Sequence, residues 1–485
     1  MKIKITGVND PLILKELAVI NQGFFAEWEF VSHECEADLE FKFDGKLTPD
    51  KTPKESRYDY LKTYLQFLTI KSGKSQPWGL LNSMRPNKLV HSMKKRGTTD
   101  IEITSELRNT YLIQDAKMNL LLNVANHQLK TIPDLYNLEQ EVSIYIGIPF
   151  CPSRCAYCTF AAYAYEPNKK WVAPFIKSLL AEIKIIGNHL KNKKTKVTSI
   201  YLGGGTPTIL ELDELKSVLT AIYENIATPD DIREITVEAG RPDTLTKEKL
   251  RLLKDFRINR LSINPQSFNE TTLDHIRRHH TTEDILTKFK MAKNIGIENV
   301  NMDLIVGLPS EGKEELARSL AHVKDLQPES LTVHMLAFKR KSEISNERQV
   351  YTVVAAEILK EMAEMTYKFT ELEGYLPYYL YRQKNIAGNL ENIGYAKSGK
   401  ECIYNILMME EAQNVLGLGV GASSKFLIGE SVHNPRDLRT YIENYAAYAR
   451  RKLELLDLSM EIRAKSFTYN PPVDDVQFLT RQSNS

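Results

Sequence analysis

Residues 148–158 read Ile148-Pro149-Phe150-Cys151-Pro152-Ser153-Arg154-Cys155-Ala156-Tyr157-Cys158, and the fold and chemistry of the chain follow from this segment. Three of the five cysteines of the chain lie here, in the spacing C-x₃-C-x₂-C. Thiolates are soft ligands, and three of them in one compact loop can hold an iron–sulfur cluster. In a four-iron cluster, three cysteine ligands leave one iron open to another molecule. We therefore expect Cys151, Cys155 and Cys158 to hold a [4Fe-4S] cluster with one open iron.

Two other uses of these cysteines fit the pattern less well. A structural zinc site calls for paired C-x₂-C knuckles or nearby histidines, and the segment has neither. A set of disulfides is disfavoured because three is an odd number and because the chain resembles a cytosolic protein. Cys35 and Cys402 lie far away in the sequence, so we do not expect either to supply a fourth ligand.

The composition is that of a soluble protein with more than one domain. A chain of 485 residues is too long for one compact core, and its 42% hydrophobic and 26% charged residues are ordinary values. The net charge of +2 gives no electrostatic reason to expect nucleic acid as a partner. The sequence contains no apolar run long enough to span a membrane, and its first residues lack the apolar run of a signal peptide. These features predict a cytoplasmic location.

Between residues 141 and 345, strand-like and helix-like patterns alternate regularly. The predicted strands are Val142–Ile148, Val197–Leu202, Glu234–Glu238, Arg260–Asn264, Val300–Ile305 and Ser330–Met335. The predicted helices between them include Trp171–Leu190, Asp213–Tyr223, Thr246–Phe256, Thr282–Ile295 and Lys313–Leu326. Six βα units predict a parallel sheet with helices outside it, and six are too few for a closed eight-stranded barrel. The pattern therefore favours an α/β fold with a partial (β/α)₆ barrel.

Two further regions flank this barrel. Residues 1–140 are predicted to be an N-terminal α/β accessory domain, with strands at Lys2–Ile5 and Phe25–Val31 and a helix at Leu12–Ile20 between them. Residues 346–485 are predicted to be a mainly helical C-terminal domain. Its segment 375–381 is rich in tyrosine and precedes Arg382, a combination that fits either a site for a carboxylate-bearing macrocycle or a packing edge.

Polar and glycine residues follow the predicted strands, at the edge where barrel enzymes gather their active sites. After the second strand comes a run of three glycines and Thr206, which either lets a ligand approach the backbone or makes a turn. Glu238 ends the third strand, and Gln266 follows the fourth. Asp303 lies inside an apolar strand, where a charge is costly unless it is paired, so a ligand role is plausible.

The cysteine spacing, with the aromatic Tyr157 before the third cysteine, resembles that of radical S-adenosylmethionine (SAM) enzymes. The flanking segment Tyr145-x-Gly147-Ile148-Pro149-Phe150-Cys151 is similar to the branch that contains oxygen-independent coproporphyrinogen III oxidase and the related haem chaperones. With Thr159 and Phe160 it is most similar to the HemZ group of coproporphyrinogen dehydrogenases. The resemblance to the wider branch covers residues 141–345, and that to the HemZ group covers most of the chain.

The resemblance implies the cofactors, the partners and the residues that bind them. One or two SAM molecules are expected, with binding residues Tyr145, Tyr157, Gly204, Gly205, Thr206, Glu238, Gln266, Arg278, Asp303 and Ala337. The expected substrate is a tetrapyrrole, a porphyrinogen whose propionates are converted to vinyl groups. The expected electron donor is a protein such as flavodoxin or ferredoxin.

Two positions depart from the oxygen-independent oxidases of this branch. Those oxidases have a fourth cysteine where Phe160 stands, and a histidine where Gly147 stands. The ending Cys158-Thr159-Phe160 is also similar to the haem-chaperone branch. A haem-binding or haem-delivery protein, or a radical SAM enzyme with another substrate, is therefore the alternative to the oxidase.

Overall fold

The computed structural model describes residues 1–466 except residues 7, 9, 23, 25–28, 32–35, 43–52, 339–341, 347–350, 352–353, 384–385 and 387–388. The chain forms two compact units, and the boundary between them in the sequence lies between Asn126 and His127. The predicted boundary at residue 140 therefore lies inside the second unit, as does the predicted boundary at residue 345. The division of the chain into residues 1–140, 141–345 and 346–485 remains a prediction.

The first unit contains a small parallel sheet and several helices. Its three strands lie in the order β2-β1-β3 and are β1 (Lys2–Thr6), β2 (Glu29–Phe30) and β3 (Leu39–Lys42). Its helices are α1 (Pro11–Gln22), α2 (Pro53–Ser72), α3 (Asn87–Lys95), α4 (Asp100–Asn109) and most of α5 (Asp115–Thr131). The predicted strand at 2–5 and the predicted helix at 12–20 are confirmed. Of the predicted strand at 25–31, residues 25–28 lie outside the described residues.

The second unit is built on one open sheet in which seven neighbouring strands are parallel. The sheet order is β12-β13-β11-β10-β9-β8-β7-β4-β14-β15-β16. The parallel strands are β4 (Val142–Ile148), β7 (Val197–Gly204), β8 (Glu234–Ala239), β9 (Arg260–Ile263), β10 (Asn299–Val306), β11 (Ser330–Met335) and β14 (Asn414–Gly419). Antiparallel strands extend both edges: β12 (Leu376–Tyr381), β13 (Asn392–Ala396), β15 (Ser423–Lys425) and β16 (Ser431–His433).

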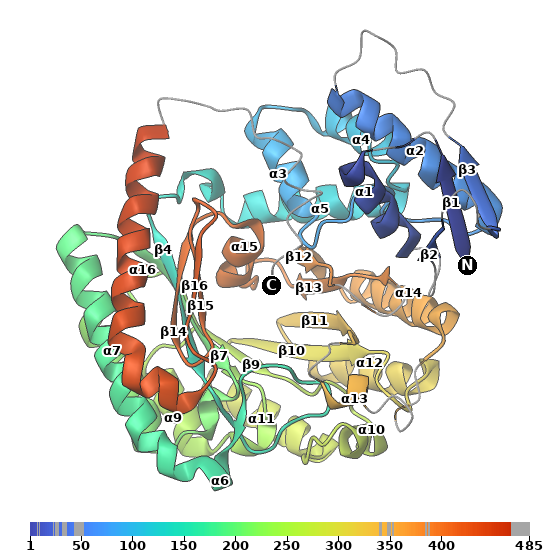
Figure 1. Ribbon diagram of the computed structural model, residues 1–485. Helices are drawn as coiled ribbons and strands as arrows, with labels where there is room; N and C mark the ends of the chain where they lie inside the picture. Colours follow the sequence, from blue (N-terminus) through green and yellow to red (C-terminus); the bar gives the residue numbers. More distant parts are fainter. Residues whose placement is uncertain are drawn as a thin grey trace. The chain divides into compact units, whose positions relative to one another are not determined.

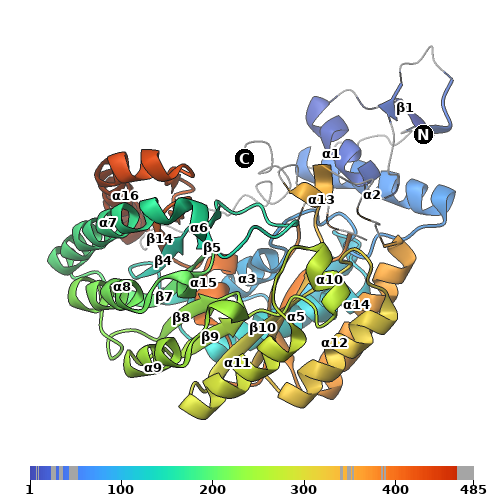
Figure 2. The same ribbon diagram turned by 90° about the horizontal axis from the view of Figure 1, so that it is seen from below.

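Helices cover the outer face of the parallel strands in chain order (Figures 1 and 2). They are α7 (Val172–Lys193), α8 (Leu212–Asn225), α9 (Lys247–Asp255), α11 (Thr282–Ile295) and α12 (Lys313–Leu326). The six predicted strands and the five predicted helices are confirmed, with ends that differ by at most a few residues. The strands were recognisable because parallel strands are buried on both faces and read as nearly continuous apolar runs.

The C-terminal region combines helices with the added strands. Its longer helices are α14 (Ala356–Leu372), α15 (Ile403–Glu410) and α16 (Leu438–Ser466). Short elements complete the unit: β5 (Phe150–Cys151), β6 (Tyr163–Ala164), α6 (Tyr165–Asn168), α10 (Glu270–His275) and α13 (Glu343–Asn346).

The glycine-rich strand β14 lies beside β4 and is held there by a buried ion pair. Glu182 of α7 and Lys452 of α16 are both fully buried and form this pair. The Glu182 carboxylate accepts a hydrogen bond from the Gly419 N–H at 2.9 Å, and the Lys452 ammonium donates to the Gly417 carbonyl at 2.6 Å. Each charge thus has a partner and also binds the backbone of β14. The pair fixes β14 against the two helices.

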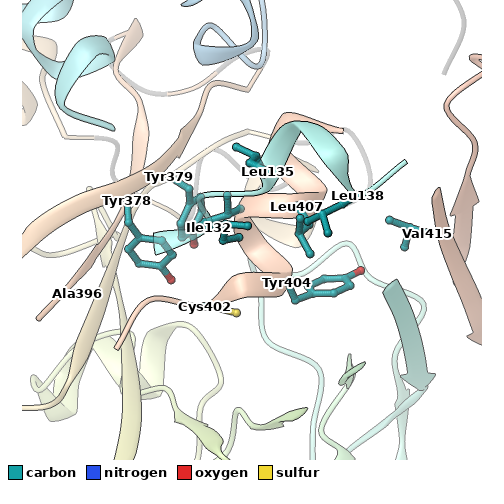
Figure 3. Packing of buried hydrophobic residues seen from close by; sticks show 11 residues of the cluster. Ile132, Leu135, Leu138, Tyr378, Tyr379, Ala396, Cys402, Tyr404, Leu407 and Val415 are labelled. Atoms are coloured by element: carbon teal, nitrogen blue, oxygen red, sulfur yellow. The ribbon is translucent and has the colours of Figure 1, made fainter. Parts of the chain in front are cut away.

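An apolar cluster packs α15 against β12, β13, the start of β14 and residues 132–138 (Figure 3). Glu234, the first residue of β8, accepts hydrogen bonds from the N–H groups of Ile403 and Tyr404, so its carboxylate caps the helix. Tyr378 and Tyr379 belong to this cluster and are buried. Of the two interpretations of the tyrosine-rich segment, a macrocycle site or a packing edge, the structure therefore shows packing for these two tyrosines.

No helix in the described part of the chain combines the length and the apolar character that a bilayer crossing requires.

Candidate active site

The cysteine loop leaves the C-terminal end of β4 and is held by backbone hydrogen bonds. The Cys158 N–H donates to the Cys155 carbonyl at 3.1 Å, which closes a turn between two of the predicted cluster ligands. The Ala156 N–H donates to the Ile276 carbonyl at 3.0 Å and joins the loop to the segment after α10. All three cysteine side chains are half-buried. Within the described residues, His, Cys, Asp and Glu side chains do not converge in threes on a position for a single metal ion.

A buried cation beside Cys155 supplies the test of whether this loop fits an anionic cluster. Arg278 is only 4% exposed, and its guanidinium donates to the carbonyls of Gly240 and Asn264. It also donates to the Tyr157 hydroxyl at 3.2 Å and lies 3.8 Å from the Cys155 sulfur. These partners carry no formal negative charge unless the cysteine is ionised, and burying a cation without a counter-charge is costly. Thiolates carrying an iron–sulfur cluster would supply that counter-charge, so the residues fit the group.

The glycine run after β7 is packed against the cysteine loop. The Gly205 N–H donates to the Ile148 carbonyl, and the Thr206 N–H donates to the Phe150 carbonyl, both at 2.7 Å. We expected these N–H groups to face a ligand, and for Gly205 and Thr206 the structure corrects this, because both groups are used within the protein. A Cβ on Gly205 would lie 2.5 Å from the Phe150 carbonyl oxygen. Glycine is thus needed so that the backbone can approach the cysteine loop.

Thr206 brings the glycine run to the first cysteine. Its hydroxyl lies 3.5 Å from the Cys151 sulfur, within the range of a weak hydrogen bond to sulfur. Gly204, at the end of β7, has a φ of +103°, a conformation that side chains other than hydrogen rarely allow. The structure therefore brings Gly204, Gly205 and Thr206 together with Cys151.

Glu238 lies near the end of β8, beside a stack of three tyrosines. Tyr145 of β4, Tyr201 of β7 and Tyr404 of α15 have stacked rings, with centroids 4.9 Å apart for Tyr201 and Tyr404. Burial, followed by the negative charge of Asp303, raises the pKa of Glu238 to about 8, and a hydrogen bond from Tyr201 opposes part of this rise. Glu238 is therefore largely a neutral carboxylic acid at pH 7 in the absence of a ligand.

Asp303 has the opposite behaviour because it has polar partners. Its carboxylate accepts a hydrogen bond from the Asn301 amide at 2.7 Å, and the His334 imidazole Nε2 lies 3.7 Å away. Burial alone would raise the pKa of Asp303, but His334, with Asn301 and Thr332, holds it below its usual value. The other nitrogen of His334 lies 3.1 Å from the Tyr381 hydroxyl. Asp303, His334 and Tyr381 thus form a polar row along β10, β11 and β12.

Gln266 joins this row through its backbone. Its N–H donates to the Asp303 carbonyl at 2.8 Å, and its carbonyl accepts from the Ile305 N–H at 2.9 Å. Its φ of +66° is unusual for a residue with a side chain, and such strain is typical of functional sites. Its buried amide oxygen has no hydrogen-bond partner among the described residues. A ligand with a donor group would satisfy it.

Tyr157 and Ala337 are held in place by different contacts. Tyr157 packs against that cluster, which includes Ala156, Ile305 and Leu336. Ala337 follows β11 and pairs with Ile386 in an isolated antiparallel bridge.

Sequence reasoning missed two buried residues beside Arg278. Arg241 follows β8 and contacts the cysteine loop, and the proline directly after it is the one local feature that marks its position. For the pair His279-His280 the sequence predicts a surface or helix-end position rather than a metal site, because adjacent residues point in different directions and no third ligand is evident. His280 directly precedes Thr281, the N-cap residue of α11, but it is 4% exposed, so the surface alternative is wrong for it. Its ring nitrogens have no hydrogen-bond partner among the described residues. Burial and the charges of Arg278 and Arg241 lower the pKa of His280 to about 3.

Comparisons with known proteins indicate the family to which the chain belongs. Residues 145–323 match the family model of the radical SAM superfamily. The chain is 42% identical to the oxygen-independent coproporphyrinogen-III oxidase-like protein HemZ of Bacillus subtilis over 499 residues, which cover 96% of this chain and 100% of the relative. It is 31% identical to the heme chaperone HemW of the same organism over 303 residues, which cover 62% of this chain and 75% of the relative.

A solved structure shows the same fold. Coproporphyrinogen III oxidase (HemN) of Escherichia coli, a radical SAM enzyme, superposes with a TM-score of 0.53 at 23% identity, covering 67% of this chain and 73% of that one. The three-cysteine loop at the C-terminal end of a parallel sheet is thus that of a radical SAM protein. Within that superfamily, the chain belongs to the family of oxygen-independent coproporphyrinogen-III oxidase-like proteins that includes HemZ.

The contact between Gly205 and Phe150 generates a first prediction. We expect Gly205→Ala to lose both the iron and the binding of SAM, because the added methyl group would displace the backbone beside Cys151. Iron content after anaerobic reconstitution and SAM binding by equilibrium dialysis measure the two effects. Gly240→Ala is the matched control, because the nearest atom to a Cβ there lies 3.8 Å away. Full iron content in Gly205→Ala would contradict the structural role of this contact.

The raised pKa of Glu238 generates a second prediction. Between about pH 5 and about pH 8 the folded apo-protein holds a proton on Glu238 that the unfolded chain has released, so this residue lowers stability as the pH rises. Glu238→Gln removes this contribution. The difference in thermal midpoint between the variant and the wild type should therefore shift in favour of the variant as the pH increases across this window. Parallel pH profiles of the two proteins would contradict the assigned pKa.

Proposed function

We propose that this protein is a cytoplasmic radical SAM enzyme that converts propionates of coproporphyrinogen III to vinyl groups without oxygen. The observation that carries the proposal is the similarity to HemZ, which runs through 96% of this chain, including the regions on both sides of the radical SAM segment. The similarity to HemW covers only 62% of the chain. The flanking regions are therefore shared with the oxidase-like relative.

In this proposal Cys151, Cys155 and Cys158 hold the cluster, and SAM binds its open iron. When bound, the two cofactors would together supply a 5′-deoxyadenosyl radical, formed with release of methionine when one electron passes from the cluster to SAM. That radical would take one hydrogen atom from the propionate β-carbon, after which CO₂ would leave and one electron would pass to a one-electron acceptor. A protein such as flavodoxin or ferredoxin supplies the electron that cleaves SAM. The protein contributes geometry and the exclusion of water.

The residues at the strand ends then have separate roles. Arg278 and Tyr157 fix the cysteine loop relative to the segments after β8 and β9. Glu238 and Asp303 are acceptors for the hydroxyl or amino groups of SAM, and the unpartnered amide oxygen of Gln266 is a third. Tyr145, Gly204, Thr206 and Ala337 complete the wall of the SAM site. The number of SAM molecules, one or two, is decided by whether the row of Asp303, His334 and Tyr381 binds a second one.

A haem-binding or haem-delivery protein is the second candidate. It is favoured by the 31% identity to HemW and by Phe160, which stands where the oxidases have a fourth cysteine. Both candidates bind a cluster and SAM, so neither property separates them. An oxidase must place a propionate within a few ångströms of the 5′ carbon of SAM, whereas a chaperone must hold haem and release it unchanged.

The cysteine assignment generates a third prediction. Replacing Cys151, Cys155 or Cys158 by Ala should remove the cluster, whereas anaerobically reconstituted wild-type protein should contain about four irons per chain. Cys402→Ala is the control, because Cys402 lies in the apolar cluster with α15 and donates to Glu234. Cys35→Ala is a second control. Equal loss of iron from either control would contradict the three-ligand assignment.

The substrate assignment is tested with coproporphyrinogen that carries deuterium at its propionate β-carbons. Anaerobic incubation with SAM and a reductant should transfer deuterium to 5′-deoxyadenosine and produce vinyl groups, which mass spectrometry detects. Unlabelled 5′-deoxyadenosine without a vinyl product, together with tight stoichiometric haem binding, would favour the chaperone. Unlabelled 5′-deoxyadenosine without haem binding would indicate a radical SAM enzyme with another substrate.

A further inference from the structure

Arg241 connects the end of β8 with the cysteine loop. It is 2% exposed, and its Nη1 donates to the Ser153 hydroxyl at 3.0 Å and lies 3.9 Å from the Cys155 sulfur. Its Nε and Nη2 face the carboxylate of Asp243 at 3.2 and 3.3 Å. One edge of the guanidinium is thus fixed by a carboxylate, and the other points its N–H groups at the cysteine loop.

Cys155 is contacted by a second guanidinium. Arg278 Nη1 lies 3.8 Å from the same sulfur, so two buried arginines donate to Cys155. The sulfur of Cys151 instead has the neutral hydroxyl of Thr206 as a neighbour, at 3.5 Å. The surroundings of Cys151 and Cys155 are therefore unequal, because both guanidinium groups contact the Cys155 sulfur, whereas a hydroxyl contacts the Cys151 sulfur.

The two arginines leave an excess of positive charge at this ligand. Asp243 offsets Arg241, but the hydrogen-bond partners of Arg278 other than Cys155 are two carbonyls and a tyrosine hydroxyl. Reducing a cluster adds one negative charge to it. Hydrogen bonds and positive charge at a ligand sulfur stabilise the reduced state more than the oxidised state, and so raise the reduction potential.

We propose that Arg241 acts with Arg278 to raise the reduction potential of the cluster through the Cys155 thiolate. The inference rests on the proposed cluster and assigns to Arg241 a positioning and tuning role rather than contact with SAM or substrate. By this device the cluster accepts an electron from a weaker donor than an unassisted three-cysteine cluster requires.

The test is a potentiometric titration of the reconstituted full-length protein without SAM, followed by electron paramagnetic resonance. Arg241→Met removes the charge and the donors, and we expect its midpoint to be more negative than that of the wild type. A tenfold loss in the one-electron equilibrium constant corresponds to a shift of about 59 mV. Arg241→Lys keeps the charge without the planar fork, and its midpoint should lie between those two.

Arg257→Met is the matched control. Arg257 lies just before the start of β9, is exposed and forms an ion pair with Asp230 rather than with the cysteine loop. It should leave the midpoint unchanged. Iron is counted in every sample. If the wild type takes up no cluster, the proposed function fails, and the tuning role fails with it.

If the wild type and Arg241→Met both hold the cluster and share one midpoint, the tuning role is overturned while the proposed function stands. If Arg241→Met takes up no cluster, the tuning role is tested with Arg241→Lys. A midpoint in that variant equal to that of the wild type overturns the proposal.

Discussion

The site depends on one buried cation. Arg278 binds the carbonyls after β8 and β9 and the hydroxyl of Tyr157, so a single guanidinium joins three loops that come from separate βα units. Its burial costs free energy, since only weakly acidic groups lie around it. An anionic cluster on the neighbouring thiolates would offset this cost. Under the proposed function, binding of the cluster and ordering of these loops would be coupled, because each would supply the charge or the geometry that the other lacks.

The core of the fold was predictable from the sequence, whereas its edges were not. The predicted strands at 142–148 and 330–335 match β4 and β11, because strands that are buried on both faces have nearly continuous apolar sequences. The strand β14 gives no such pattern, since it contains glycines at 417 and 419, which have low strand propensity. It is a strand because β4 pairs with it and because Glu182 and Lys452 bind its backbone. β4, Glu182 and Lys452 are separated from β14 in the sequence, and no local sequence pattern indicates that they contact it.

The same limit applies to the site. Glu238, Gln266 and Asp303 could be proposed because each follows or interrupts an apolar strand, and the structure places Gln266 against Asp303. Arg241 and His280 lie in loops, where burial depends on what the chain brings from elsewhere. A charged residue directly before a proline at the end of a barrel strand is the one local feature that could have indicated Arg241. The direction of the Gly205 N–H was likewise decided by the position of the cysteine loop.

The two departures from the oxidases of this branch have structural readings that do not concern the chemistry. Gly147 lies opposite Gly419 in the register of β4 and β14. A Cβ on Gly147 would lie 3.2 Å from the Val420 carbonyl oxygen and 3.4 Å from the Tyr145 ring, so a larger side chain there would push β14 away. Phe160 is 64% exposed, outside the buried surroundings of Arg278 and Cys155. Gly147 thus lies where a neighbouring strand approaches closely, and Phe160 lies at the surface.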